Sequence, residues 1–204
     1  MKIQFRYFFL LGIVFLSFSL QAQNSNFDPY KLKAEYFKNK DVKDGLLFDD
    51  QKGNAFKIKN SEYSRGLYIK KDGKWLKHGV FYSMTKGRVR AKTMYSYGKK
   101  HGAYESYHSN GKIQFQYNNK NNLKEGKWYQ YRNDGSLFEE KVFKNGQIHG
   151  TKISYHLNGE KNFVSTYVNG KKHGERLQYN NKGKLIGRSQ FNMGKKVGKT
   201  QWLY

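Results

Sequence analysis

The stretch GKWYQYRNDGSLFEEKVFKNGQIHG, residues 126–150, decides the fold of this chain. It holds two segments, KWYQY and SLFEEKVF, in which apolar and polar side chains alternate, and turn signals follow them at Gly135 and Gly146. Alternation with a period of two is typical of a β-strand, and Asn-Gly or Asp-Gly dipeptides tolerate the positive φ of hairpin turns. The stretch therefore predicts one β-hairpin, with QIHG read as part of the connection to the next.

The same pattern recurs along the chain every 24 residues. The glycines that end each unit, here called the comb glycines, are Gly79, Gly102, Gly126, Gly150, Gly174 and Gly198, the first of them one residue out of step. A fixed period of this length is the signature of a repeat protein. We therefore predict a continuous antiparallel sheet with two strands per unit over residues 79–197, and no long helix between Gly102 and Gly198.

The repeated residues also resemble a known family. The pattern G-x-W-x-x-Y-x-x-x-G, followed by an apolar residue, a phenylalanine and H-G, stands at Gly126, Trp128, Tyr131, Gly135, Leu137, Phe143 and His149-Gly150. It resembles the MORN repeat, in the bacterial variant often labelled as a YwqK-type antitoxin. The resemblance covers residues 79–204 and extends to degenerate repeats at 43–78. It implies an all-β fold, an elongated, single-layer, twisted antiparallel sheet of tandem hairpins, with a scaffold or binding role and no catalysis.

The histidines could be catalytic bases, zinc ligands or structural residues, and their spacing favours the last. His101, His149 and His173 each precede a comb glycine, as does His78. A catalytic base is normally singular, whereas a residue that recurs at one phase serves the repeat. Equivalent residues of adjacent hairpins lie about 10 Å apart, too far to share one ion. We expect these histidines and Gly102, Gly126, Gly150 and Gly174 to be structural, and no catalytic, cofactor or metal residues.

Two consecutive acids, Glu139 and Glu140, are the remaining candidates for acid–base chemistry. Neighbouring residues of a strand point to opposite faces, so these carboxylates cannot act on one substrate as a pair. We expect both to be solvated surface. The chain is therefore not expected to be an enzyme.

The sequence predicts an export signal at the N-terminus. Lys2 and Arg6 precede the apolar run of residues 7–20, which is too short to span a membrane and suits a signal peptide covering residues 1–22. Residues 23–42 follow as a linker or a short helix that caps the sheet, begun by Asp28 and Pro29. The chain has no cysteine, which excludes disulfides and a lipoprotein anchor. We expect a periplasmic, outer-envelope associated or extracellular protein.

Charge and aromatic content suggest a binding surface. Lys and Arg number 39 against 15 Asp and Glu, and paired lysines recur where we expect the turns between units. The candidate contacts are an exposed aromatic stripe and these lysines, at Phe81, Tyr104, Trp128, Lys171, Lys172, Lys195 and Lys196. The alternative for the lysines is an ordinary solvated face.

Three functions fit these observations. The first is an exported scaffold that binds a protein partner or an anionic envelope component, lipid or polysaccharide, including peripheral membrane contact. The second is an antitoxin, as the family label suggests, which the signal peptide argues against. The third is binding of single-stranded nucleic acid by charge and stacking, although export makes genomic DNA a poor target. No cofactor is implied, and the sequence leaves the oligomeric state open.

Overall fold

The computed structural model describes residues 28–30, 42–50 and 52–203. The predicted signal peptide lies outside these residues, as does most of the predicted linker or capping helix. Of that segment, residues 28–30 form a turn in which the backbone N–H of Tyr30 donates to Asp28 Oδ1 over 2.9 Å. Across the described ranges, no helix has the length and apolar character needed to cross a membrane.

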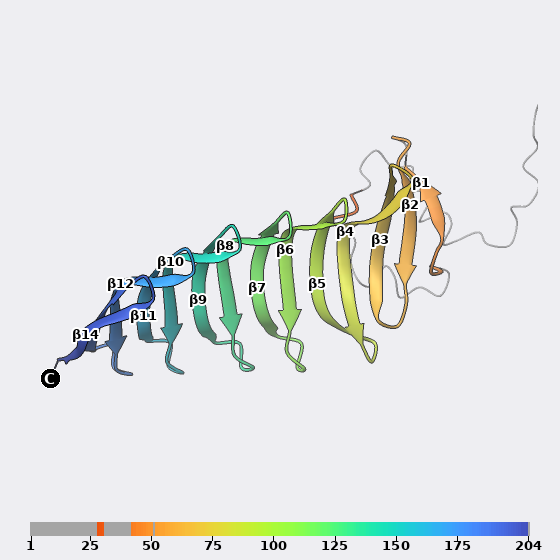
Figure 1. Cartoon of the computed structure of the whole chain (residues 1–204). Helices are drawn as coiled ribbons and strands as arrows, with labels where there is room; N and C mark the ends of the chain where they lie inside the picture. The colour runs from red at the N-terminus through yellow and green to blue at the C-terminus, as the bar shows by residue number, and fades with distance from the viewer. Residues whose placement is uncertain (1–27, 31–41, 51, 204) are drawn as a thin grey trace, which may run out of the picture. The chain divides into compact units, whose positions relative to one another are not determined.

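Within residues 47–85 and within residues 99–202, each strand is hydrogen-bonded to the strand that follows it in the sequence (Figure 1). The sheet is antiparallel throughout the pairings recorded, and no residue from Gly102 to Gly198 is helical. Both observations confirm the prediction of tandem hairpins. The strands are β1 (Leu47–Asp49), β2 (Ala55–Asn60), β3 (Ser64–Lys71), β4 (Lys74–Thr85), β5 (Arg88–Ser96), β6 (Lys99–Tyr107), β7 (Ile113–Lys120), β8 (Leu123–Tyr131), β9 (Leu137–Lys144), β10 (Gln147–Tyr155), β11 (Lys161–Val168), β12 (Lys171–Tyr179), β13 (Leu185–Asn192) and β14 (Lys195–Trp202).

The chain divides into two compact units. Of the described residues, those up to residue 89 and residues 94–98 form unit 1, and residues 90–93 and those from residue 99 onward form unit 2. In unit 1, Ile58, Leu67 and Val80 are fully buried, and Phe56 and Ile69 pack with them. Burial alternates along β2, so its apolar side chains share one face. Within the described residues, the buried apolar side chains that form a core cluster lie in this unit.

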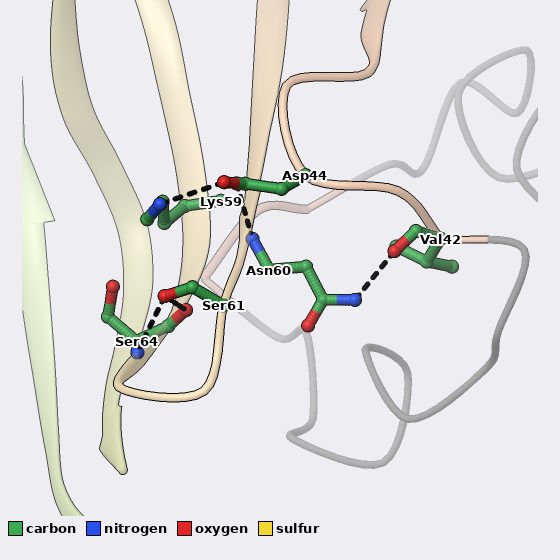
Figure 2. A network of polar contacts seen from close by, with 6 residues as sticks. All are labelled: Val42, Asp44, Lys59, Asn60, Ser61 and Ser64. Atoms are coloured by element: carbon green, nitrogen blue, oxygen red, sulfur yellow. Dashed lines mark hydrogen bonds and ion pairs between the residues drawn. The ribbon is translucent and has the colours of Figure 1, made fainter.

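A polar clasp, Val42, Asp44, Lys59 and Asn60, holds the segment before β1 against β2 (Figure 2). Asp44 accepts hydrogen bonds from Lys59 Nζ and from the backbone N–H of Asn60, both over 2.9 Å. Asn60 Nδ2 donates to the carbonyl of Val42 over 2.6 Å. The bond from Lys59, more than any other contact, holds the pKa of Asp44 below its usual value. The clasp keeps Val42 buried against the core of unit 1.

Two kinds of turn alternate along unit 2. Asn145-Gly146, between β9 and β10, has φ of 50° and 79°, as a two-residue type I′ turn requires. The opposite end of β9 is joined to β8 by the loop 132–136, in which the N–H of Arg132 donates to the carbonyl of Ser136 over 2.8 Å. There only Gly135 has a positive φ, of 95°. Both dipeptide types close hairpins as predicted, through different turns.

Side chains of the longer loops bind the next hairpin. Because a carbonyl only accepts, the ring nitrogen or guanidinium must be the donor in each case. The bond recurs at His108 Nε2 to the Tyr131 carbonyl (2.9 Å), Arg132 Nη2 to the Tyr155 carbonyl (2.5 Å) and His156 Nε2 to the Tyr179 carbonyl (3.0 Å). The same repeat position thus connects three of the hairpins to their successors.

The comb glycines lie inside strands and not in connections, which corrects the sequence-based assignment of QIHG. Gly126 in β8 and Gly150 in β10 have φ of 76° and 95°. Between Ile148 and Lys152 the pairing of β10 with β9 shifts register. Extra residues on one strand make a β-bulge, and glycine supplies its positive φ. The bulge glycine and the turn glycine have the same local sequence signals, so composition could not separate them.

Replacing a bulge glycine should strain the backbone. An added Cβ at Gly126 would meet no atom within 4 Å, so the cost comes from its φ alone. We expect Gly126→Ala to lower the free energy of unfolding by about 1 kcal/mol. Gly126→Asn should be milder, because asparagine tolerates this conformation. Urea unfolding measures both, and equal stability of Gly126→Ala and the parent would contradict the expectation.

Candidate functional site

Strand alternation gives unit 2 two faces. We call them the Trp128 face and the Tyr131 face after one residue on each. On the Trp128 face, cross-strand pairing aligns a cross-sheet row: Tyr104, Tyr117, Trp128, Lys141, Lys152, Ser165, Arg176 and Ser189. The row begins with three aromatic side chains, continues with two lysines, and ends with Arg176 between two serines.

Trp128 is buried, which corrects the expectation that it is exposed. It is 6% exposed, because the ring of Phe115 lies 5.4 Å from its own and Lys141 Nζ stands 3.8 Å above it. Tyr104 is half-buried and stacks on Tyr117 at 4.5 Å. Burial and the neighbouring Tyr104 raise the pKa of Tyr117 to about 12. These rings pack mainly with their neighbours in the row.

Phe81, in unit 1, is also buried and not part of an exposed stripe. It is 5% exposed and lies directly on the backbone of Gly66, where a Cβ would come within 2.7 Å of its ring. The rings of Tyr68 and Tyr95 meet it edge-on. Close packing against a glycine explains the burial. Contact of Phe81, Tyr104 or Trp128 with a partner stays a prediction.

The paired lysines begin strands and do not lie in turns. Lys171 and Lys172 are the first residues of β12, and Lys195 and Lys196 those of β14. Neighbouring strand residues point to opposite faces. Lys172 stands over the ring of Phe191 on the Trp128 face, so Lys171 projects from the Tyr131 face. The four predicted contact lysines are therefore divided equally between the faces.

Cations lie over aromatic rings along the Trp128 face. Lys124 Nζ is 5.0 Å from the centre of the Tyr117 ring, and the Arg176 guanidinium is 3.9 Å from that of Phe163. Burial, followed by the nearby positive charges, lowers the pKa of Lys124 and of Lys172. A lysine whose neighbours are cations favours an anion beside it. The face thus carries positive charge that its own acids do not neutralise fully.

Glu139 forms two ion pairs that the sequence analysis did not predict. Its carboxylate accepts a hydrogen bond from Lys141 over 2.9 Å and lies 2.7 Å from Lys152 Nζ, with only 12% of the side chain exposed. The expectation of solvated surface was wrong for Glu139, although it and Glu140 do face opposite ways. The signal was Lys152, where the repeat pattern has an aromatic residue.

The pairing of Glu139 predicts an acid-dependent loss of stability. Burial alone would raise the pKa of Glu139, but Lys152 and Lys141 outweigh it and the pKa is lowered. A carboxyl group whose pKa is lower in the folded than in the unfolded protein stabilises the fold at pH values above its unfolded pKa, about 4.3 for glutamate. This stabilisation is lost as the pH falls through the pKa of the folded state. Melting temperatures from pH 7 to pH 3 should therefore fall less steeply below about pH 5 for Glu139→Gln.

The control for this experiment is Glu175→Gln. Glu175 is exposed and lies 4.0 Å from Arg188, so its contribution should be small. A parallel acid profile for Glu139→Gln and the parent would show that the Glu139 pair does not contribute.

An open hollow of about 310 Å³ lies on the Trp128 face between β9 and β12. Its charged side chains come from three strands, because register brings Glu139, Lys152 and Arg176 together across them. Lys172 also lines the hollow, and aromatic and small polar side chains complete it: Phe138, Ser154, Asn162, Phe163, Ser165 and Tyr167. Of its three cations, Lys172 was a predicted contact, whereas Lys152 and Arg176 were not.

The histidines that precede the comb glycines lie within strands, at the β-bulges. His101 and His173 are exposed, and His149 Nδ1 lies 3.3 Å from Asn169 Oδ1 in the next tight turn. At the equivalent position, Glu125 accepts the N–H of Asn145 over 2.8 Å. Both contacts join a bulge to the following turn. In the described parts of the chain, no three His, Cys, Asp or Glu side chains are grouped as metal ligands would be.

The Tyr131 face carries the tyrosines that repeat every 24 residues. Tyr131 and Tyr155 are half-buried. Tyr155 donates its hydroxyl to Glu140 over 2.6 Å, and burial together with that carboxylate raises the pKa of Tyr155. This arrangement stabilises the sheet and leaves the carboxylate already hydrogen-bonded.

Comparison with known proteins adds a family. The model described as MORN repeat variant matches residues 100–121 and 124–145, the hairpins β6–β7 and β8–β9. Among solved structures, the crystal structure of the GtfA/B complex bound to UDP and GlcNAc is similar at 17% identity with a TM-score of 0.22. The match covers 53% of this chain and 21% of that one, so the chain spans about a fifth of its length.

That structural likeness is too low to carry an argument. A search of curated proteins found no match. The YwqK-type antitoxin label receives no support from these matches. The model described as MORN repeat variant, by contrast, falls on two of the hairpins whose bulges and turns are described above, and residues 100–145 are therefore similar to MORN repeats of the variant type.

Proposed function

We propose that this chain is an exported, non-enzymatic repeat scaffold that binds an anionic component of the cell envelope through the Trp128 face of unit 2. The MORN repeats support a binding scaffold in general. The observation that carries the finer proposal is the concentration of cations on one face: Lys124, Lys141, Lys152, Lys172 and Arg176. Glu139 pairs with two of them and leaves a net positive charge.

Charge supports this function better than aromatic contact does. Because Phe81 and Trp128 are buried, they offer little area to a protein partner. Stacking of nucleobases requires open ring faces, whereas Arg132 covers Phe138 and Arg176 covers Phe163. The apolar N-terminus of the sequence favours export, and an antitoxin would need a cytosolic partner. Fractionation of the native protein tests export, and recovery in the cytosol would contradict it.

Two pairs of lysine substitutions test the face directly. We expect Lys172→Gln with Lys196→Gln to weaken binding to dextran sulfate or phosphatidylglycerol vesicles about fivefold. Lys171→Gln with Lys195→Gln removes the same charge from the Tyr131 face and should change binding less. Binding should also weaken between about 0.05 M and about 0.5 M salt, because screening shortens the range of the field.

Circular dichroism confirms that each variant is folded before binding is compared. Equal loss in the two pairs would mean that net charge, and not the Trp128 face, attracts the anion. Absence of binding to both anionic probes at the lower salt concentration would contradict the proposed function.

A further inference from the structure

The cross-sheet row changes character where the hollow lies. Over its first strands the row is filled, since Tyr104 stacks on Tyr117 and Lys141 covers Trp128. From β11 onward it carries Ser165 and Ser189, whose side chains are small, with Arg176 between them. Large neighbours beside a small residue leave a depression in a sheet surface. The hollow is therefore a product of the repeat sequence at Ser165 and its neighbours.

Two cations at the hollow have no acidic partner. Lys152 is paired with Glu139, which also binds Lys141. Lys172 and Arg176, by contrast, have rings beside them, and no carboxylate within the described residues comes within ion-pair distance of either. Lys172 and Arg176 both lie on β12 and line the same space. An incoming carboxylate could pair with both, and the guanidinium offers the two parallel donors that suit it.

The rest of the lining suits a hydroxylated ligand. Glu139 accepts hydrogen bonds, whereas Ser154, Asn162 and Ser165 can donate or accept them. Phe138 and Phe163 add apolar area, and an arginine lies over one face of each ring. The combination matches sugar hydroxyls better than a flat base or an acyl chain. The volume of about 310 Å³ lies at the lower end of small-ligand sites.

We propose that the hollow binds one carboxylated sugar residue of an acidic polysaccharide, with the carboxylate on Arg176 and Lys172 and the hydroxyls on Glu139 and Asn162. The inference rests on the proposed function, since it identifies the anion that the Trp128 face binds. The proposed ligand is a carbohydrate. Nucleic acid and anionic lipid become outcomes of the test.

Titration calorimetry with trigalacturonic acid and its methyl ester tests the carboxylate. The full chain should bind the acid about tenfold more tightly than the ester, because esterification removes the negative charge and blocks one carboxylate oxygen with a methyl group. Arg176→Gln should weaken binding of the acid about tenfold. The matched control, Arg188→Gln, removes an arginine from β13 that faces Glu175 and should stay within about twofold.

Ser165→Leu tests the shape of the hollow, since it fills the space without changing charge. We expect it to abolish binding of trigalacturonic acid while retaining binding to dextran sulfate. Should Ser165→Leu fail to fold by circular dichroism, Arg176→Gln decides the matter. Equal affinity for acid and ester, unchanged affinity in Arg176→Gln, or tighter binding of oligothymidylate or phosphatidylglycerol vesicles would overturn the proposal.

The two proposals fail in different ways. If dextran sulfate binds and is weakened by Lys172→Gln with Lys196→Gln, but trigalacturonic acid does not bind, only the sugar assignment is wrong. If neither probe binds, the proposed function is wrong as well.

Discussion

Trp128→Ala should destabilise unit 2 by about 3 kcal/mol, the lower end of the range for removing a buried large aromatic side chain. The substitution removes the ring contact with Phe115 and leaves Lys141 without the ring beneath it. It also leaves a cavity in the row, because the neighbouring Tyr117 is held by Tyr104. Urea unfolding followed by far-UV circular dichroism measures the loss.

The control for Trp128→Ala is Trp202→Ala. Trp202 is 51% exposed, so its removal should cost about 1 kcal/mol or less. Trp128→Phe should recover much of the stability, since a ring remains in the row. If Trp128→Ala unfolds like the parent but loses a binding partner, Trp128 is a contact residue and the packing argument is wrong.

Leu67→Ala should have an effect of similar size in unit 1, about 3 kcal/mol within the ~2–5 kcal/mol range for leucine truncation. Leu67 is 0% exposed and pairs with Ile58 on β2 and with His78 on β4. Neighbours on both sides are in strands and cannot collapse readily into the space. Thermal unfolding monitored by circular dichroism provides the measurement.

Leu47→Ala is the matched control for this second experiment. It removes the same atoms from the same unit, but Leu47 is 61% exposed. We expect a change of about 0.5 kcal/mol or less. Similar losses for Leu67→Ala and Leu47→Ala would show that β2, β3 and β4 do not form the buried core described.

The strand pattern could be predicted because its determinants are local. Alternation within eight or nine residues specifies a strand, and Asn145-Gly146 specifies a tight turn wherever the chain places it. The 24-residue period then extends one hairpin to all of them. The prediction for the comb glycines was wrong because it used the same local signals. Glycine with a positive φ, as at Gly150, occurs both in bulges and in turns. Cross-strand register alone distinguishes the two.

Side-chain exposure could not be predicted from the pattern. Trp128 occupies a position that alternation assigns to one face, but its burial depends on Phe115 and Lys141, which belong to different strands. The lysine pairs illustrate the same limit. The sequence pattern predicted Lys171 and Lys172 in one turn. Because β12 begins at Lys171, their side chains instead lie on opposite faces of that strand.

The sequence by itself determined the repeat and the hairpins, because both depend on residues within one unit and on their recurrence. The tertiary structure decided which side chains share a surface. Glu139, Lys152 and Arg176 lie on three different strands, and only the register of β9 to β12 brings them to one hollow. Contacts across strands depend on pairing of residues distant in sequence, which a period of 24 residues does not encode.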